Sequence, residues 1–179
     1  MVHRTPFFLP LLYPSLIWRI PSERKELFLT FDDGPVSGPT DFVLETLTRL
    51  KAKATFFCIG DNIRKYPEVF RQVAAQGHVV GNHTFNHLNG WRTNTSKYVE
   101  NMRKCHEEIR THLFGEEAQD LSTYLFRPPY GRITRDQISS LSDCKIIMWD
   151  VLSVDYNSNK QDGNEKAINQ LISHHSVVF

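Results

Sequence analysis

The chain has 179 residues, of which 40% are hydrophobic and 12% aromatic, enough to bury the core of one globular domain. Its 21 basic and 20 acidic side chains are spread along the chain and form no basic stripe, so we expect no nucleic-acid partner. The cysteines Cys58, Cys105 and Cys144 form no CxxC pair. We therefore expect free thiols and a cytoplasmic location, with the cell envelope or secretion as the alternative.

The N-terminal residues 6–18 (PFFLPLLYPSLIW) are apolar, but three prolines interrupt them. Each proline removes a helix donor and clashes with the preceding turn, so this run cannot form an undisturbed helix of about 20 residues that crosses a bilayer. No small-residue cleavage site follows it. We expect residues 1–25 to be an extended segment packed on the core and residues 26–179 to form the domain; a degenerate export signal is the alternative.

From residue 26 onward, short apolar runs alternate with stretches of helical spacing, which is typical of repeated βα units. The predicted strands cover residues 26–31, 54–60, 78–84, 123–131, 144–153 and 176–179. The predicted helices cover residues 40–51, 67–77, 98–113, 134–141 and 165–172. This order predicts a parallel α/β barrel or a doubly wound sheet, and in either fold ligands bind at the carboxyl ends of the strands.

Polar clusters follow several of these strands. In TFDDGP (residues 30–35), Asp32 and Asp33 end an apolar strand, and adjacent carboxylates repel each other unless a cation or a proton intervenes. For this motif alone, a solvated Asp-Asp-Gly-Pro turn is an equally good interpretation.

A pair of histidines, His83 and His87, follows the third strand in NHTFNH (residues 82–87). Histidines four residues apart share one face of a helical turn, so both imidazoles can reach one ion. Surface or capping histidines are the commoner explanation of that spacing alone. Here Asp33 offers a third ligand, because strand ends converge in an α/β core. One carboxylate and two imidazoles suit Zn²⁺ and related divalent ions and leave one coordination position open.

Two later clusters carry further candidates. In RPPYG (residues 127–131), two prolines follow Arg127, so Tyr130 has the first free backbone N–H on a stiff loop. Such a donor suits an oxyanion, and a rigid turn with Arg127 in a surface ion pair is the alternative. In WDVLSVDY (residues 149–156), the rings of Trp149 and Tyr156 beside carboxylates suit a sugar, although solvated acids at a strand end explain the stretch equally well.

In this order and spacing, TFDDGP, HTFNH and RPPYG resemble the polysaccharide deacetylase family, the NodB-homology domain of carbohydrate esterase family 4, over about residues 26–179. The resemblance implies a distorted (β/α) barrel, a divalent metal, usually zinc, and hydrolysis of N-acetyl groups on an N-acetylglucosamine-type glycan such as peptidoglycan or a chitin-like oligosaccharide. It also implies site residues. The metal ligands are Asp33, His83 and His87, and the catalytic base is Asp32, which Arg127 holds. The Tyr130 amide is the oxyanion donor, Asp155 tunes the general acid, and Tyr130, Trp149 and Tyr156 contact the sugar.

The sequence departs from the family pattern in two places. Tyr156 stands where the family usually has tryptophan, which changes the expected shape of the sugar groove. The family's general-acid histidine follows a strand like SVVF, whereas this sequence stops at Phe179, so we expect a domain truncated at its C-terminus that deacetylates poorly. The alternatives to a deacetylase are a metal-bearing sugar-binding domain with little turnover and a metal-dependent amidohydrolase acting on a non-sugar amide.

Overall fold

A computed structural model describes residues 3–23, 26–115, 124–152 and 177–178 of the chain. Its contacts divide the chain into two compact units, a larger one of residues 31–146 and a smaller one that joins residues 1–30 to residues 147–179. The predicted helix at residues 165–172 and the site candidates Asp155 and Tyr156 lie outside the described residues.

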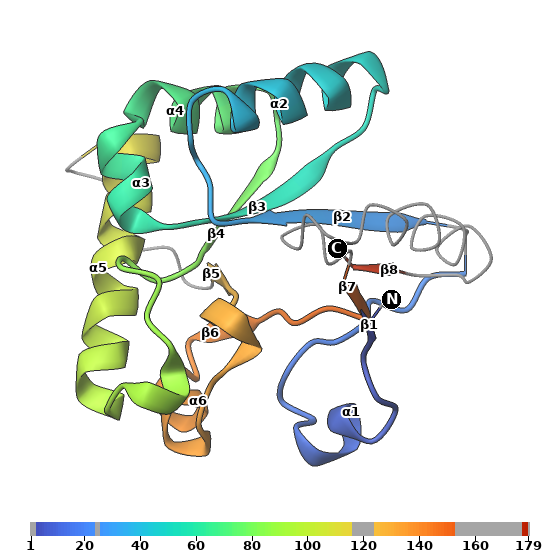
Figure 1. Cartoon of the computed structure of the whole chain (residues 1–179), viewed down its shortest axis with the longest axis vertical. Helices are drawn as coiled ribbons and strands as arrows, with labels where there is room; N and C mark the ends of the chain where they lie inside the picture. Colours follow the sequence, from blue (N-terminus) through green and yellow to red (C-terminus); the bar gives the residue numbers. More distant parts are fainter. Residues whose placement is uncertain (1–2, 24–25, 116–123, 153–176, 179) are drawn as a thin grey trace. The chain divides into compact units, whose positions relative to one another are not determined.

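The larger unit is built on a parallel sheet flanked by helices (Figure 1). Its strands pair in the order β6-β5-β4-β3, with bounds β3 (Ala54–Cys58), β4 (Val79–Asn82), β5 (Tyr124–Phe126) and β6 (Cys144–Ile146). Its helical segments are α2 (Pro39–Arg49), α3 (Gly60–Lys65), α4 (Pro67–Ala75), η1 (Gly90–Arg92), α5 (Thr95–Phe114), η2 (Pro129–Gly131) and α6 (Arg135–Ser140). The predicted α/β class with a parallel sheet is therefore confirmed.

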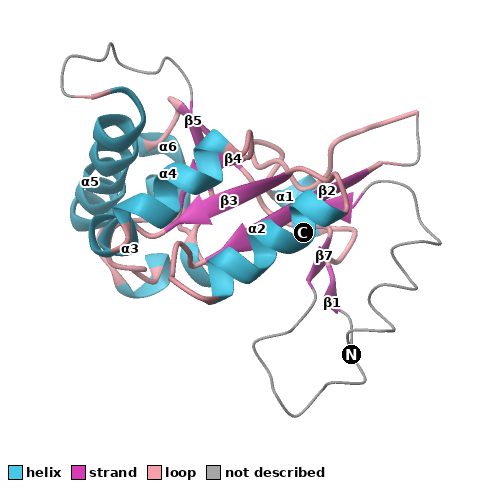
Figure 2. Ribbon diagram, turned by 90° about the horizontal axis from the view of Figure 1, so that it is seen from above, coloured by secondary structure: helices cyan, strands magenta, loops and turns pink. Residues whose placement is uncertain are grey.

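The longest helix, α5, shows how the sequence pattern becomes packing. Its fully buried side chains Tyr98, Met102 and Cys105 recur at helical spacing and form the single stripe that faces the core. Asn94 caps the helix by accepting a hydrogen bond from the backbone N–H of Lys97 at 2.9 Å. In both Figure 1 and Figure 2, α5 lies beside α3 and α4, which it contacts.

Several predicted boundaries are wrong for local reasons. Helix α2 covers Pro39–Arg49 rather than residues 40–51, and the Thr40 hydroxyl accepts the backbone N–H of Val36. Gly60 does not simply end a strand but begins α3, which the sequence pattern did not predict; a Cβ there would lie 2.6 Å from the Phe85 ring, so the glycine permits close packing. The predicted strand at 144–153 is two separate strands, β6 and β7.

In the described part of the smaller unit, two strand pairs are present. β1 (His3–Arg4) pairs antiparallel with β7 (Val151–Leu152), and β2 (Leu27–Asp32), whose last two residues belong to the larger unit, pairs parallel with β8 (Val177–Val178). The N-terminal segment also includes one helical turn, α1 (Leu9–Leu12), and Ile17 forms a parallel bridge with Ile147. The division between residues 1–25 and 26–179 stays a prediction.

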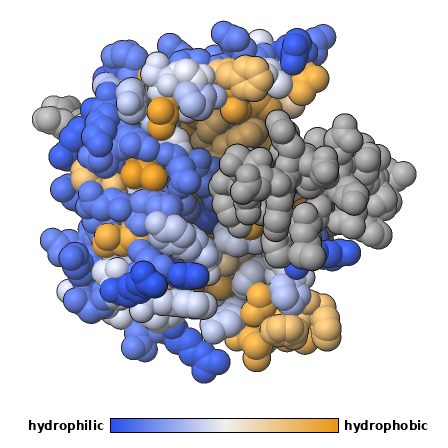
Figure 3. Space-filling view, viewed as in Figure 1, coloured by the Kyte–Doolittle hydropathy of each residue, from blue (hydrophilic) through white to orange (hydrophobic). Residues whose placement is uncertain are grey.

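Several large apolar side chains around α1 are exposed, among them Phe7 and Leu11 (Figure 3). Within the described ranges, the helices are all too short or too polar to cross a membrane.

Candidate metal centre

The end of β2 turns sharply at Asp33. Its φ of 68° is left-handed, a conformation that aspartate tolerates better than most residues. Asn62 of α3 donates its Nδ2–H to the backbone carbonyl of Asp33 at 2.7 Å and fixes the turn from the helix side. The Asp33 side chain remains 65% exposed, so its carboxylate is available to a cation.

The two histidines lie on an irregular loop after β4. Thr84 and His87 have left-handed φ values of 63° and 54°, so the predicted sharing of one helical face is wrong. Asn82 accepts the Thr84 N–H at 2.8 Å, and the Thr84 hydroxyl accepts the Leu88 N–H at 3.1 Å. These two hydrogen bonds stabilise a tight loop in place of the predicted helical turn. The loop brings both imidazoles to the same point.

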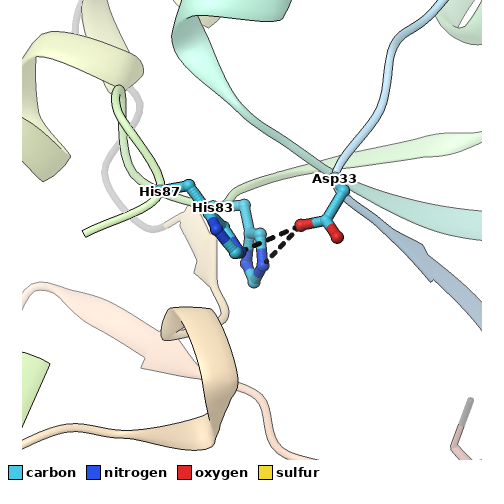
Figure 4. A group of neighbouring side chains, drawn as sticks. All are labelled: Asp33, His83 and His87. Atoms are coloured by element: carbon cyan, nitrogen blue, oxygen red, sulfur yellow. Dashed lines mark ion pairs between the residues drawn. The ribbon is translucent and has the colours of Figure 1, made fainter. Parts of the chain in front are cut away.

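The structure brings the three predicted ligands together, as Figure 4 shows. Asp33 Oδ1 lies 3.4 Å from His83 Nε2 and 3.0 Å from His87 Nε2, and the three ligand atoms lie within 4.8 Å of one another. Metal–ligand bonds of about 2.0 to 2.2 Å in a tetrahedron separate neighbouring ligand atoms by about 3.4 Å. The donor set therefore fits a divalent metal ion, and His83 is buried while Asp33 faces solvent.

The protonation pattern of these groups also suits a cation. His83 Nδ1 lies 2.7 Å from the backbone carbonyl of Arg127, and because a carbonyl can only accept, Nδ1 must carry the proton. Nε2 is then the ring nitrogen that a metal ion would take, the arrangement usual for metal-ligating histidines, and in the metal-free protein it faces Asp33 Oδ1. Hydrogen bonding with His83, and then with His87, lowers the pKa of Asp33 well below its ordinary value, so this carboxylate is ionised.

The neighbouring carboxylate, Asp32, has a different partner. Arg127 Nη1 donates to Asp32 Oδ1 at 2.8 Å, and the guanidinium stacks 4.2 Å from the centre of the Phe57 ring. Arg127 is only 2% exposed, so the alternative of a surface ion pair is wrong. Burial lowers the pKa of Arg127, and the carboxylate of Asp32 opposes that shift. The two adjacent aspartates are thus held by different parts of the fold.

Tyr130 lies next to the histidine loop. Its φ of 60° is left-handed, and its ring centre lies 4.6 Å from that of His87. The side chain is 58% exposed, so one part of the ring contacts His87 while the rest is open to solvent. The role of its amide as an oxyanion donor stays a prediction.

Residues 19–149 match the family model described as Polysaccharide deacetylase. The chain belongs to the polysaccharide deacetylase family. Over 144 residues it is 36% identical to a peptidoglycan-N-acetylglucosamine deacetylase of Bacillus cereus, covering 79% of this chain and 50% of the relative. Over 145 residues it is 32% identical to the peptidoglycan-N-acetylmuramic acid deacetylase PdaC of Bacillus subtilis, covering 81% of this chain and 29% of the relative. The chain thus spans half or less of the length of these two relatives.

The fold agrees with the family. The crystal structure of the Bc1960 peptidoglycan N-acetylglucosamine deacetylase superposes with a TM-score of 0.82 at 31% identity, covering 97% of this chain and 78% of that one. This likeness confirms the distorted (β/α) barrel implied by the sequence motifs.

Of the remaining predicted site residues, Asp155 and Tyr156 lie outside the described residues, so that only Trp149 can be described. Trp149 belongs to the smaller unit, where its backbone carbonyl accepts a hydrogen bond from the Thr5 hydroxyl. Its neighbour Asp150 is buried and pairs with Arg19 at 2.9 Å and with Arg4 at 3.7 Å. For Asp150, the interpretation as a solvated acid is therefore wrong.

Sequence reasoning missed the asparagines that support the loops. Asn82 directly precedes His83, and a short polar side chain before a ligand is a signal of a side-chain-stabilised turn. Asn62 gives no such signal, because its partner Asp33 is 29 residues away in the chain.

Proposed function

We propose that this protein is a metal-dependent N-deacetylase of N-acetylglucosamine-type glycans, with Zn²⁺ as its metal. Family membership supports the proposal, as do the names of the relatives, which are peptidoglycan deacetylases. In this proposal Asp33, His83 and His87 are the metal ligands, Asp32 is the base, and Arg127 orients that base.

The observation that carries the proposal is that the two adjacent aspartates have different partners. Asp33 joins the two imidazoles, whereas Asp32 is held by the buried guanidinium of Arg127. A domain that only bound a sugar through a metal would need the carboxylate of Asp33 but not that of Asp32. Burying an arginine is costly unless it is paired, so its placement behind Asp32 favours a positioned catalytic group.

The chemistry assigns a task to each group. When bound, a zinc ion polarises a carbonyl and lowers the pKa of water to about 7. Asp32 then accepts a proton from the water that attacks the acetyl carbon, in the orientation that Arg127 fixes. The Tyr130 amide donates a hydrogen bond to the oxygen that becomes negative as the carbonyl carbon turns tetrahedral. The C–N bond then breaks, acetate keeps the oxygen of the water, and the departing sugar amine takes a proton from a general acid, which the family resemblance places after the last predicted strand. In this proposal Asp155 keeps its predicted role of tuning the general acid, and Trp149 and Tyr156 keep their predicted contacts with the sugar.

For the substrate we propose peptidoglycan rather than chitin-like oligosaccharides. Both relatives described above are named for peptidoglycan, one for its N-acetylglucosamine and the other for its N-acetylmuramic acid. A peptidoglycan substrate favours the cell envelope over the cytoplasm as the place of action.

Acetate release tests this function. The protein is incubated with peptidoglycan fragments, with N-acetylglucosamine oligomers and with non-sugar acetamides, each before chelation, after chelation and after zinc is restored. We expect zinc-dependent acetate from the glycans. Acetate from the non-sugar amides alone would identify an amidohydrolase of another class. Zinc and glycan binding without any acetate would identify a sugar-binding domain instead.

A further inference from the structure

The loop that carries both histidines depends on support from outside itself. Thr84 and His87 both have left-handed backbones, and neither is a glycine, so the conformation is less stable than an ordinary turn. Residues 85 and 86 lie between the two histidines in the chain, so the conformation of their backbone sets how the two imidazoles are placed relative to each other. Whatever holds those two residues therefore holds the distance between His83 and His87.

The side chain of Asn101, on α5, makes three hydrogen bonds to this stretch, and the Asn101 backbone carbonyl also accepts the Phe85 N–H at 3.2 Å. Its Oδ1 accepts the backbone N–H of Phe85 at 2.9 Å and that of Asn86 at 3.0 Å. Its Nδ2 donates to Oδ1 of Asn86 at 2.8 Å. One side chain thus binds consecutive residues of the loop, midway between the two histidines.

The helix that carries Asn101 is well anchored at that point. The next residue, Met102, is fully buried, and its carbonyl accepts a hydrogen bond from Asn82 Nδ2 at 2.8 Å. Tyr98, one turn earlier, is also fully buried. Two consecutive residues of α5 therefore bind the loop, one just before His83 and one between the histidines.

We propose that Asn101 is a positioning residue for the metal centre, which fixes residues 85 and 86 so that His83 and His87 reach one ion. The proposal rests on the metal site of the proposed function. It makes the affinity for metal depend on a side chain of α5 that is not itself a ligand. The partners of metal ligands typically contribute about 10- to 100-fold in affinity.

The test measures the Zn²⁺ affinity of the full chain by competition with a chromophoric chelator. Asn101→Ala should weaken binding by about 10- to 100-fold. Asn101→Asp should restore affinity to within about threefold of wild type, because a carboxylate accepts both N–H groups and the Asn86 amide can flip to donate its Nδ2–H. Asn86→Ala removes only the side-chain contact and should weaken binding less than Asn101→Ala.

Asn94→Ala is the matched control, since it removes an asparagine from the same helix, with its cap bond to Lys97, and leaves the loop intact. It should lower the melting temperature without changing Zn²⁺ affinity. Wild-type affinity in Asn101→Ala, or an equal loss in Asn94→Ala, would overturn the positioning role. If Asn101→Ala does not fold, unchanged affinity in Asn86→Ala together with a large loss in Asn101→Asp would overturn it. A wild-type chain that binds no Zn²⁺ would instead refute the metal centre and the proposed function.

Discussion

Two aspartates at strand ends, Asp33 in the larger unit and Asp150 in the smaller, have opposite surroundings. Asp33 is 65% exposed and faces two imidazole nitrogens, whereas the side chain of Asp150 is 7% exposed and pairs with Arg19 and Arg4. Arginines keep their positive charge, so they neutralise Asp150 at every ordinary pH. The charge of Asp150 therefore stabilises the folded chain. The imidazole nitrogens that face Asp33 are common metal ligands, so a metal ion between them and the carboxylate would bind all three groups.

The largest expected effect concerns Asp32. It neighbours Asp33 in the chain but, like Asp150, it pairs with an arginine. Asp32→Asn should reduce acetate release by about 10²- to 10⁴-fold, the usual cost of losing a general base, because an amide cannot take the proton. Zn²⁺ affinity should stay close to wild type, since Asp32 pairs with Arg127 and not with the imidazoles. Kinetics and a chelator competition on the same preparation check both parts. Metal loss equal to that of Asp33→Asn would show that the two roles are wrongly divided.

Asp33→Asn should weaken Zn²⁺ binding by more than about 100-fold, because a direct ligand contributes more than the 10- to 100-fold typical of its outer partners. The apo protein should keep its thermal stability, since this carboxylate is mostly exposed. Isothermal titration and thermal melts in chelator measure the two quantities. Intact zinc binding in Asp33→Asn would remove this residue from the ligand set.

Asp150→Asn should show the reverse behaviour. The free energy of unfolding should fall by about 1 to 2 kcal/mol, less than for a fully buried pair because both arginines are about half exposed. Zn²⁺ affinity should not change. Urea denaturation of the apo protein and the same zinc titration provide the check. A clear loss of zinc affinity with no loss of stability would break the contrast between the two aspartates.

The smallest effect extends the comparison to a buried base, His78. Burial lowers its pKa from the ordinary 6.5, and Lys53 adds to the shift, so the folded protein keeps this imidazole neutral where the unfolded chain binds a proton. Stability from this group is therefore complete above about pH 6.5 and is lost as the pH falls through the folded-state pKa.

The free energy of unfolding is measured between pH 5 and pH 8 with chelator present. As the pH falls, it should decrease more for wild type than for His78→Asn, by less than about 1 kcal/mol. The two proteins differ only at residue 78, so the difference between their profiles isolates His78. Parallel pH profiles would mean that His78 binds its proton equally well in the folded and unfolded states.

The sequence by itself determined which chemical groups stand at the strand ends and that three of them would lie together. The alternation of apolar runs predicted the parallel α/β class, and the strand-end rule predicted that Asp33, His83 and His87 would meet, because both patterns express local preferences that survive folding. The pairing of Arg127 with Asp32 came from the family resemblance rather than from these patterns.

Tertiary structure decided how those groups are held. The left-handed loop replaced the predicted helical turn, because Asn82 and Asn101 satisfy its backbone donors. The arginine partners made Asp150 structural although its local sequence looks like that of a solvated acid. Asp32 and Arg127 are 95 residues apart in the chain, and Arg19 and Asp150 are 131 apart. Contacts over such separations depend on which elements pack together, and a local window of sequence carries no record of that packing.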